Sequence, residues 1–255
     1  LAFDENELQW AEDIFRKIDA KMEKTLPRTK CVIPYRVENG RFENMAEKNI
    51  CWWTNGFWEG LLWLLYSRTG KQAYREAAQQ GEALLDGAFR NYPRLHHDVG
   101  FLWQLSAGLD YKLTGNNESR LRALFAASIL MSRFNLGGGY IRAWNDYPND
   151  DTSGWSIIDT MMNLSILYWA SKELGDARFA RVAQAHADKS LRHHLRPDGS
   201  SKHIVVYDPQ TGEELAERAG QGYACGSAWS RGQAWALYGF AISYRHTGKQ
   251  EYLDA

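Results

Sequence analysis

Apolar and polar positions along this chain repeat as pairs of segments separated by a glycine. Four times, a strongly apolar segment with helical spacing ends at a glycine and is followed by a segment with one polar face. The four glycines are Gly70, Gly115, Gly175 and Gly248. Glycine commonly ends a helix, because it adopts the left-handed backbone conformation without strain. The pattern therefore predicts four hairpins, each made of two helices joined at a glycine.

The two helices of each predicted hairpin differ in polarity. The apolar segment 61–66, for example, leads into the polar-faced segment 71–85. Unequal spacing between the glycines argues against a strict solenoid but is natural for hairpins joined by loops of different length. We therefore expect an all-α fold of the α/α-toroid type, with apolar inner helices and amphipathic outer helices. A further helix is expected over 4–24, and the chain stops at Ala255, just inside an outer helix.

One stretch interrupts the helical pattern. The β-branched run 202–207 has turn-forming residues on both sides, at 197–200 and at 208–212. Such an arrangement is typical of a strand bounded by turns. We predict a short β-hairpin in a loop.

Composition and charge favour a single soluble domain over 1–255. With 255 residues, of which 44% are hydrophobic, the chain is long enough for one large core, and no shift in composition marks a second domain. Lysine and arginine number 30 against 31 aspartate and glutamate, so the net charge of −1 provides no field to attract nucleic acid or an anionic membrane. The apolar stretches, such as 60–66, are too short to cross a bilayer. We expect a cytoplasmic protein, while a chain that begins at Leu1 leaves a periplasmic or secreted location open.

Neither the cysteines nor the acidic stretch 145–154 follows a metal-site pattern. The three cysteines, Cys31, Cys51 and Cys225, have no metal-ligand spacing, and free structural thiols are expected. The acidic stretch 145–154 does not follow an EF-hand pattern, which disfavours calcium. The chain also contains 11 Trp and 13 Tyr, whose flat faces suit sugar rings as well as protein cores.

Chemically distinctive residues stand at similar distances before the four glycines. Asn55, Asp98, Asp159 and Arg231 each lie 15 to 17 residues ahead of the glycine that ends their helix. At a rise of about 1.5 Å per residue, a difference of two positions is about 3 Å along a helix axis. If the inner helices have similar lengths, these residues lie at one level. We therefore predict that they converge at one mouth of the toroid and form the active site.

Two carboxylates in such a mouth would suit acid–base chemistry. Burial and mutual repulsion drive the pKa values of neighbouring carboxyls apart and leave one protonated near neutral pH. Arg231 would bind a substrate carboxylate, and nearby tryptophan faces would hold a ring. Together these features favour an acidic sugar as the substrate.

Each candidate also has an ordinary structural explanation. Asp98 stands two residues before Gly100 and could cap a helix. Asp159 is harder to explain in that way, because it lies in the apolar run 157–162, where an ionised side chain is costly unless it is paired. Arg231 could be a buried ion-pair partner. Core or surface positions would equally explain the remaining candidates, which are His97, His203, Trp52, Trp144 and Trp235.

Four motifs stand at the level where the predicted inner helices begin. They are WWTNGFW at 52–58, HDVGF at 97–101, SIIDTMMNL at 156–164 and RGQAW at 231–235. With these motifs the chain resembles, over nearly its whole length, the unsaturated glucuronyl hydrolases of glycoside hydrolase family 88. The resemblance implies a fold of six helical hairpins. It also implies a substrate with a terminal 4,5-unsaturated uronic acid, the non-reducing-end product of polysaccharide lyases that act on glycosaminoglycans or similar polymers.

The resemblance further implies a mechanism and a set of site residues. Asp159 resembles the general acid and base that protonates C4 and activates water for attack at C5, so that the vinyl ether is hydrated, the ring opens and the aglycone leaves. Asp98 resembles a second essential carboxylate, which would hold the substrate and help to keep Asp159 protonated. The other matching positions line the family's substrate pocket, and they are Trp52, His97, Trp144, His203, Gln221, Arg231 and Trp235. No metal or organic cofactor is implied.

The chain departs from this family in its number of hairpins, and other functions compete. Four hairpins and an opening helix are predicted against six, so we expect a truncated segment or an open toroid. An unsaturated rhamnogalacturonyl hydrolase acting on pectin fragments would share the fold and chemistry, but HDVGF at 97–101 favours the glucuronyl type. A non-catalytic protein that binds acidic sugars would not need both Asp98 and Asp159. A helical-repeat scaffold would have no reason to gather polar residues at one level.

Overall fold

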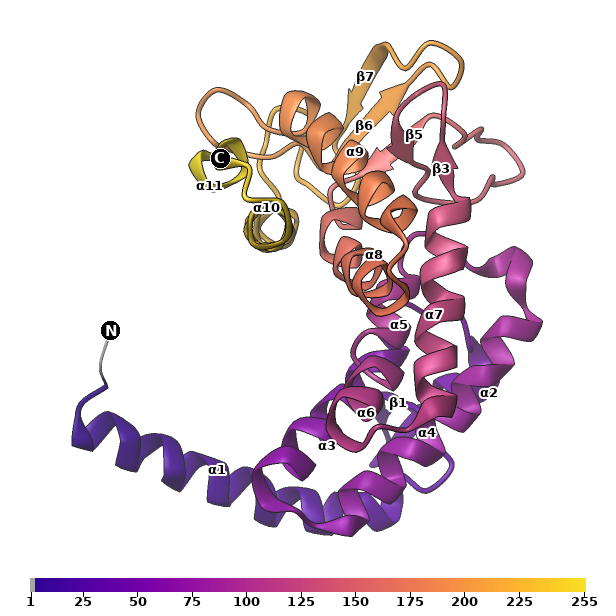
Figure 1. The fold of residues 1–255 in the computed structure, drawn as a ribbon. Helices are drawn as coiled ribbons and strands as arrows, with labels where there is room; N and C mark the ends of the chain where they lie inside the picture. The colour runs from indigo at the N-terminus through magenta and orange to yellow at the C-terminus, as the bar shows by residue number, and fades with distance from the viewer. Residues whose placement is uncertain (1–2) are drawn as a thin grey trace.

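Paired helices dominate the computed structural model, which describes residues 3–255, and they follow an open arc in Figure 1. The first helices of the pairs are α3 (Asn55–Thr69), α5 (Val99–Trp103) with α6 (Ala107–Thr114), α8 (Thr160–Leu174) and α10 (Ser230–Thr247). The second helices are α4 (Gln72–Arg90), α7 (Asn117–Ser132), α9 (Ala177–His193) and α11 (Gln250–Asp254). This order along the chain confirms the four predicted hairpins.

A glycine in the left-handed conformation ends the first helix of every pair. The φ angles of Gly70, Gly115, Gly175 and Gly248 are 69°, 74°, 65° and 70°, and the N–H of each donates to the carbonyl four residues earlier. A Cβ atom would strain this conformation, which is why glycine is favoured there. The four predicted helix ends are confirmed.

The first helices pack against one another and form the inner layer. Helix α8 contacts both α5 and α10, and α3 contacts α5. In α8, nine of 15 residues are buried, whereas in α9 only five of 17 are. A helix that is apolar on most sides must be covered on most sides, while an amphipathic helix can leave one face in solvent. The predicted division into inner and outer helices is therefore confirmed for this pair.

The close approach of α5 to α8 depends on Gly100. A Cβ atom at this position would lie 2.5 Å from Oδ1 of Asn163 and 2.9 Å from its Cα atom. The buried Asn163 side chain ties the two helices, because Oδ1 accepts from the N–H of Phe101 at 2.8 Å and Nδ2 donates to the carbonyl of Asp159 at 3.1 Å. This packing brings the starts of α5 and α8 together, and with them Asp98 and Asp159.

The inner helix of the second pair is interrupted, although the sequence pattern predicts one helix there. Helix α5 ends at Trp103, and α6 begins at Ala107. Between them, the hydroxyl of Ser106 donates to the carbonyl of Leu102 at 2.5 Å. A side-chain hydroxyl that bonds back to the main chain competes with the helical ladder, and the hydrophobic spacing does not report it.

The predicted β-hairpin is confirmed and belongs to a larger sheet. Strand β6 (Ile204–Tyr207) pairs antiparallel with β7 (Glu214–Arg218), and β5 (Trp155–Ile157) pairs with the other edge of β6. Strand β5 ends two residues before Asp159, so the sheet helps to place that residue. Two further hairpins are not predicted by the sequence pattern, and they are β1 (Pro34–Glu38) with β2 (Arg41–Asn44) and β3 (Phe134–Asn135) with β4 (Tyr140–Ile141).

Helix α1 (Glu5–Thr25) confirms the helix expected over 4–24. Asp4 caps it, since its side chain accepts from the N–H of Glu7 while the Glu7 side chain accepts from the N–H of Asp4. In Figure 1, α1 and α10 stand on opposite sides of the opening in the arc. The short helices that complete the chain are α2 (Met45–Lys48) and the 3-10 helices Leu26–Arg28 and Tyr92–Arg94. Over residues 3–255, none of the helices has the length and apolar character needed to cross a membrane.

Candidate active site

A cavity of about 160 Å³ lies where the inner helices begin. Its walls are formed by Trp52, Trp53, His96, His97, Asp98, Trp144, Tyr147, Ile157, Asp159, His203, Gln221 and Arg231. A larger cavity, of about 370 Å³, lies between α1 and α4, but among residues 3–255 its lining contains no histidine, cysteine, aspartate or tryptophan, and two of its charged side chains, Lys71 and Glu23, are paired with each other. The smaller cavity is the candidate active site, because it gathers carboxyl, imidazole, guanidinium and indole groups.

Eight of the nine residues singled out from the sequence line this cavity, namely Asp98, Asp159, Trp52, His97, Trp144, His203, Gln221 and Arg231. Trp235 lies outside the cavity wall, and its ring packs 5.1 Å from that of Phe101, measured between ring centroids. Asn55, predicted to converge on the same mouth, also lies outside the cavity wall, because its Nδ2 donates to the carbonyls of Asn49 and Ile50, at 3.1 and 2.9 Å.

The charged groups reach the cavity from the starts of inner helices. Asp98 and Asp159 occupy the N-cap positions of α5 and α8, and Arg231 lies in the first turn of α10. Neither aspartate side chain makes a capping hydrogen bond, so capping does not explain Asp98. The N-terminal ends of α8 and α10 also present partial positive charge, which favours an anionic ligand.

Asp98 and Asp159 are largely buried carboxyls. Their side chains are 11% and 13% exposed, and Oδ1 of each has no hydrogen-bond partner within residues 3–255. Burial, together with the charge of Asp159, raises the pKa of Asp98 well above its usual range. Burial also raises the pKa of Asp159, to about 6, against the opposing effect of Arg231. Both carboxyls therefore hold their protons more firmly than an exposed aspartate does.

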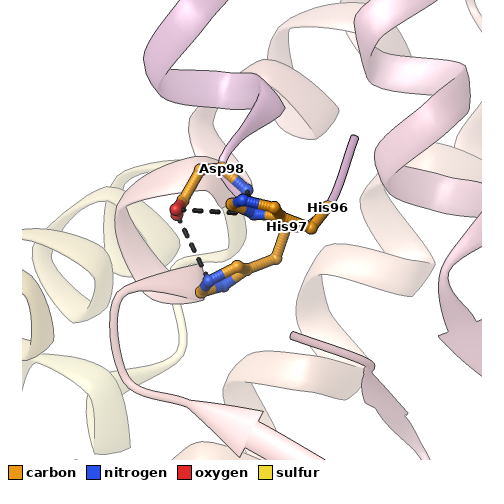
Figure 2. Close-up of side chains that lie close together, drawn as sticks. All are labelled: His96, His97 and Asp98. Carbon is orange, nitrogen blue, oxygen red and sulfur yellow. Dashed lines mark hydrogen bonds and ion pairs between the residues drawn. The ribbon is translucent and has the colours of Figure 1, made fainter. Parts of the chain in front are cut away.

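Two histidines stand beside Asp98, as Figure 2 shows. Nε2 of His97 lies 3.3 Å from Oδ1 of Asp98, and Nδ1 of His96 lies 3.5 Å from Oδ2. Burial lowers the pKa of His96 to about 4 and that of His97 well below its usual range. Both imidazoles are therefore neutral near pH 7, and their contacts with Asp98 are not ion pairs. On its other side, Nδ1 of His97 lies 2.6 Å from Oγ1 of Thr160.

Arg231 is held between two indole rings. Its guanidinium carbon lies 5.1 Å from the ring centroid of Trp53 and 4.2 Å from that of Trp229. Nη2 donates to Oε1 of Gln221 at 2.7 Å, and Nε has no partner among the described residues. Stacking fixes the plane of the guanidinium and leaves donors unused, an arrangement suited to binding a carboxylate. Arg231 is therefore not a buried ion-pair partner, the alternative explanation, because within residues 3–255 its guanidinium bonds to the amide of Gln221 and not to a carboxylate.

His203 points its ring nitrogen Nε2 at Asp159. Its Nδ1 lies 3.0 Å from the backbone nitrogen of Gln221, whose N–H donates to it, and 3.2 Å from the carbonyl oxygen of Ala219. Nε2 faces Oδ1 of Asp159 at 3.8 Å. Burial lowers the pKa of His203 to about 4, so the ring is neutral near pH 7. His203 is 4% exposed and directly precedes β6. The alternative explanation, that it is an ordinary surface residue, is therefore wrong.

Four lining residues were not singled out from the sequence. Trp53 and His96 directly adjoin the selected Trp52 and His97, and these neighbours in the sequence are the signal that could have found them. Tyr147 comes from the acidic stretch 145–154, where no periodic pattern places side chains. Ile157 looks like any core residue of a strand.

Arg133 fixes the wall that carries His97 and Trp144, and the sequence gives no signal for it. Its guanidinium donates to the carbonyls of Leu95, Arg142, Ala143 and Trp144 and to Oδ1 of Asn145, at 2.9 to 3.3 Å. The N–H donors of this rigid, planar group thereby tie Leu95, two residues before His97, to the segment 142–145, which contains Trp144.

Comparison with known proteins identifies similar sequences. The profile of Glycosyl Hydrolase Family 88 matches residues 28–253. The chain is 41% identical over 203 residues to the unsaturated glucuronyl hydrolase of Bacillus sp. (strain GL1), a match that covers 79% of this chain and 54% of the relative. It is 39% identical over 203 residues to the unsaturated chondroitin disaccharide hydrolase of Streptococcus pyogenes serotype M1, covering 79% and 51%. The chain thus spans about half the length of the curated relatives it matches.

Solved structures show the same fold. The crystal structure of the Bacillus sp. GL1 unsaturated glucuronyl hydrolase, described as responsible for glycosaminoglycan degradation, matches with a TM-score of 0.83 and 36% identity, over 90% of this chain and 61% of that chain. An unsaturated glucuronyl hydrolase specific for heparin matches with a TM-score of 0.81 and 31% identity, over 95% and 65%. The predicted α/α-toroid fold class is confirmed.

Proposed function

Since this chain belongs to glycosyl hydrolase family 88, we propose that it is an enzyme that releases the 4,5-unsaturated uronic acid from the non-reducing end of lyase-generated oligosaccharides. One observation carries the proposal: the largely buried carboxyls of Asp98 and Asp159 share a cavity with Arg231, whose guanidinium keeps an unused donor. An unsaturated uronate requires a proton donor at its double bond and a cation for its carboxylate.

The proposed reaction is hydration of the vinyl ether between C4 and C5. Asp159, in its protonated form, donates a proton to C4, and positive charge develops on C5 and the ring oxygen. The Asp159 carboxylate then accepts a proton from the water that attacks C5. The hemiketal so formed collapses by breaking the bond between C5 and the ring oxygen. The hemiacetal that this leaves at C1 expels the aglycone as an alcohol.

The groups around Asp159 would hold the substrate for these steps. Arg231 binds the uronate carboxylate through its free donors. Asp98 keeps its proton and donates a hydrogen bond to the sugar. Nε2 of His203 faces Asp159 without a hydrogen bond between them, so it is available to the substrate or to the attacking water. The remaining lining residues that we assign to substrate binding are Trp52, His97, Trp144 and Gln221.

We assign the substrate to the glycosaminoglycan type, a choice supported by the names of the relatives. The test is to follow the ultraviolet absorbance of the C4–C5 double bond with unsaturated chondroitin, gellan and pectin disaccharides. We expect the fastest loss with chondroitin. Loss with the pectin disaccharide alone would favour a rhamnogalacturonyl hydrolase. If no disaccharide loses its absorbance while one of them binds, the chain is a sugar-binding protein and not a hydrolase.

The rate should depend on the protonation of Asp159. Its pKa is raised to about 6, so the proton needed at C4 is present below that pH and is lost above it. The groups facing Asp159 are the protonated Asp98, the neutral His203 and the cationic Arg231. We expect kcat/KM to fall as pH rises through about 6. A profile that stays flat from about pH 5 to 8 would contradict this role.

A further inference from the structure

Three side chains with metal-binding atoms face one another at the start of α5, as Figure 2 shows. A ring nitrogen of His96, a ring nitrogen of His97 and a carboxylate oxygen of Asp98 all lie within 4.8 Å of one another. Each histidine lies closer than that to one of the two carboxylate oxygens: His96 Nδ1 is 3.5 Å from Oδ2 of Asp98, and His97 Nε2 is 3.3 Å from Oδ1. These atoms are imidazole nitrogens and carboxylate oxygens, the ligand types that Zn²⁺ prefers besides thiolate.

The two histidine–carboxylate separations match the spacing of ligands around a tetrahedral ion, and the third separation is below 4.8 Å. Zn²⁺ binds imidazole nitrogen and carboxylate oxygen at about 2.0–2.2 Å, so two of its ligands stand roughly 3.3–3.5 Å apart. From this geometry we infer that His96, His97 and Asp98 form a binding site for a divalent transition-metal ion of the Zn²⁺ class. Three protein ligands leave a fourth coordination position for water.

Two further features prepare these residues to act as ligands. Oδ1 of Asp98 is buried without a hydrogen-bond partner within residues 3–255, so an ion at that oxygen displaces no existing bond. Thr160 Oγ1 lies 2.6 Å from Nδ1 of His97 and can accept a hydrogen bond from it. Metal-bound histidines commonly donate their second ring N–H in this way, which directs the other nitrogen to the ion. The ion takes the place of the proton that Asp98 otherwise holds, so binding releases a proton to the solvent.

An ion at this position inhibits the enzyme. The three ligands belong to the wall of the 160 Å³ cavity, and Asp98 is one of the groups assigned to hold the sugar. A bound ion occupies both the carboxylate and part of the space that the substrate needs. The inhibitory effect rests on the proposed function, whereas binding of the ion does not.

The binding test uses Co²⁺, whose visible absorption reports tetrahedral coordination. The whole chain is freed of metal with a chelator and then titrated. We expect one ion per chain, displaced by Zn²⁺, and binding weaker by at least about tenfold in His96→Asn. The matched control is His193→Asn, because His193 contacts Glu214 and lies outside the cavity wall. It should bind Co²⁺ as the wild type does. Absence of binding, or binding unaffected by His96→Asn, would overturn the site.

The inhibition test follows the loss of the C4–C5 absorbance with and without Zn²⁺. Each variant is compared with its own metal-free rate. We expect Zn²⁺ to abolish the activity of the wild type and a chelator to restore that activity. The His96→Asn variant should need a Zn²⁺ concentration at least about tenfold higher for the same inhibition. Tight Co²⁺ binding without inhibition would overturn the inhibitory effect. A chain that binds Co²⁺ but acts on no unsaturated disaccharide would refute the proposed function and leave the metal site standing.

Discussion

Replacing Asp159 by asparagine is expected to lower kcat by roughly 10²–10⁴-fold. The amide can neither give a proton to C4 nor take one from the attacking water, so both proton transfers lose their catalyst. Binding should change little, because the amide resembles the protonated carboxyl in size and polarity. The measurement is the rate at which the C4–C5 absorbance of an unsaturated chondroitin disaccharide disappears.

Asp198→Asn is the matched control for this substitution. Asp198 is exposed in a turn, where its carboxylate accepts from the N–H of Ser200 at 2.9 Å, and it lies outside the cavity wall. The control should keep wild-type kinetics. Thermal unfolding of both variants shows whether either has lost its fold. If folded Asp159→Asn keeps a wild-type kcat, another group transfers the proton and the proposed role of Asp159 is wrong.

Arg231→Met is expected to raise KM strongly. The methionine keeps an apolar stem between Trp53 and Trp229 but removes the cation that would meet the uronate carboxylate. Removing one partner of a desolvated charge pair costs roughly 2–5 kcal/mol, so kcat/KM should fall by at least about 30-fold. Steady-state kinetics on the same disaccharide separate the effect on KM from that on kcat.

The same substitution should also move the pH profile. Arg231 holds the pKa of Asp159 down, so its removal should shift the fall in kcat/KM to higher pH. Arg231→Lys keeps the charge but not the planar fork, and it should recover part of the binding while leaving the profile near that of the wild type. An unchanged KM and an unchanged profile in Arg231→Met would show that the substrate carboxylate binds elsewhere.

The helical part of the fold could be predicted because its signals are local. Gly70 and Gly248, like the two other marker glycines, end their helices through their own backbone conformation. Whether a helix is apolar or amphipathic follows from how much of its surface other helices cover. The strands of β3 and β4 are only two residues long, and pairing of that kind depends on contacts that no local pattern encodes. The break at Ser106 depends on one hydroxyl, which the spacing of apolar residues does not register.

The candidate site could be predicted where its residues stand at helix starts. Similar inner-helix lengths bring Asp98, Asp159 and Arg231 to one cavity, and counting back from a glycine finds them, although the same count also selects Asn55, which lies outside the wall. Trp235 is one helical turn beyond Arg231, yet its ring packs against Phe101, which only the neighbouring helix decides. The raised pKa values of the two aspartates likewise come from their burial, which the sequence does not contain.

The central claim is that the chain hydrates the double bond between C4 and C5, and the most direct test is the reaction in D₂O followed by NMR at early times. Delivery of the solvent deuteron by Asp159 predicts a ring-opened product with one deuterium on a single face of C4. Displacement at the anomeric carbon would instead release a sugar that still contains the C4–C5 double bond and carries no deuterium at C4. That second result would contradict the account.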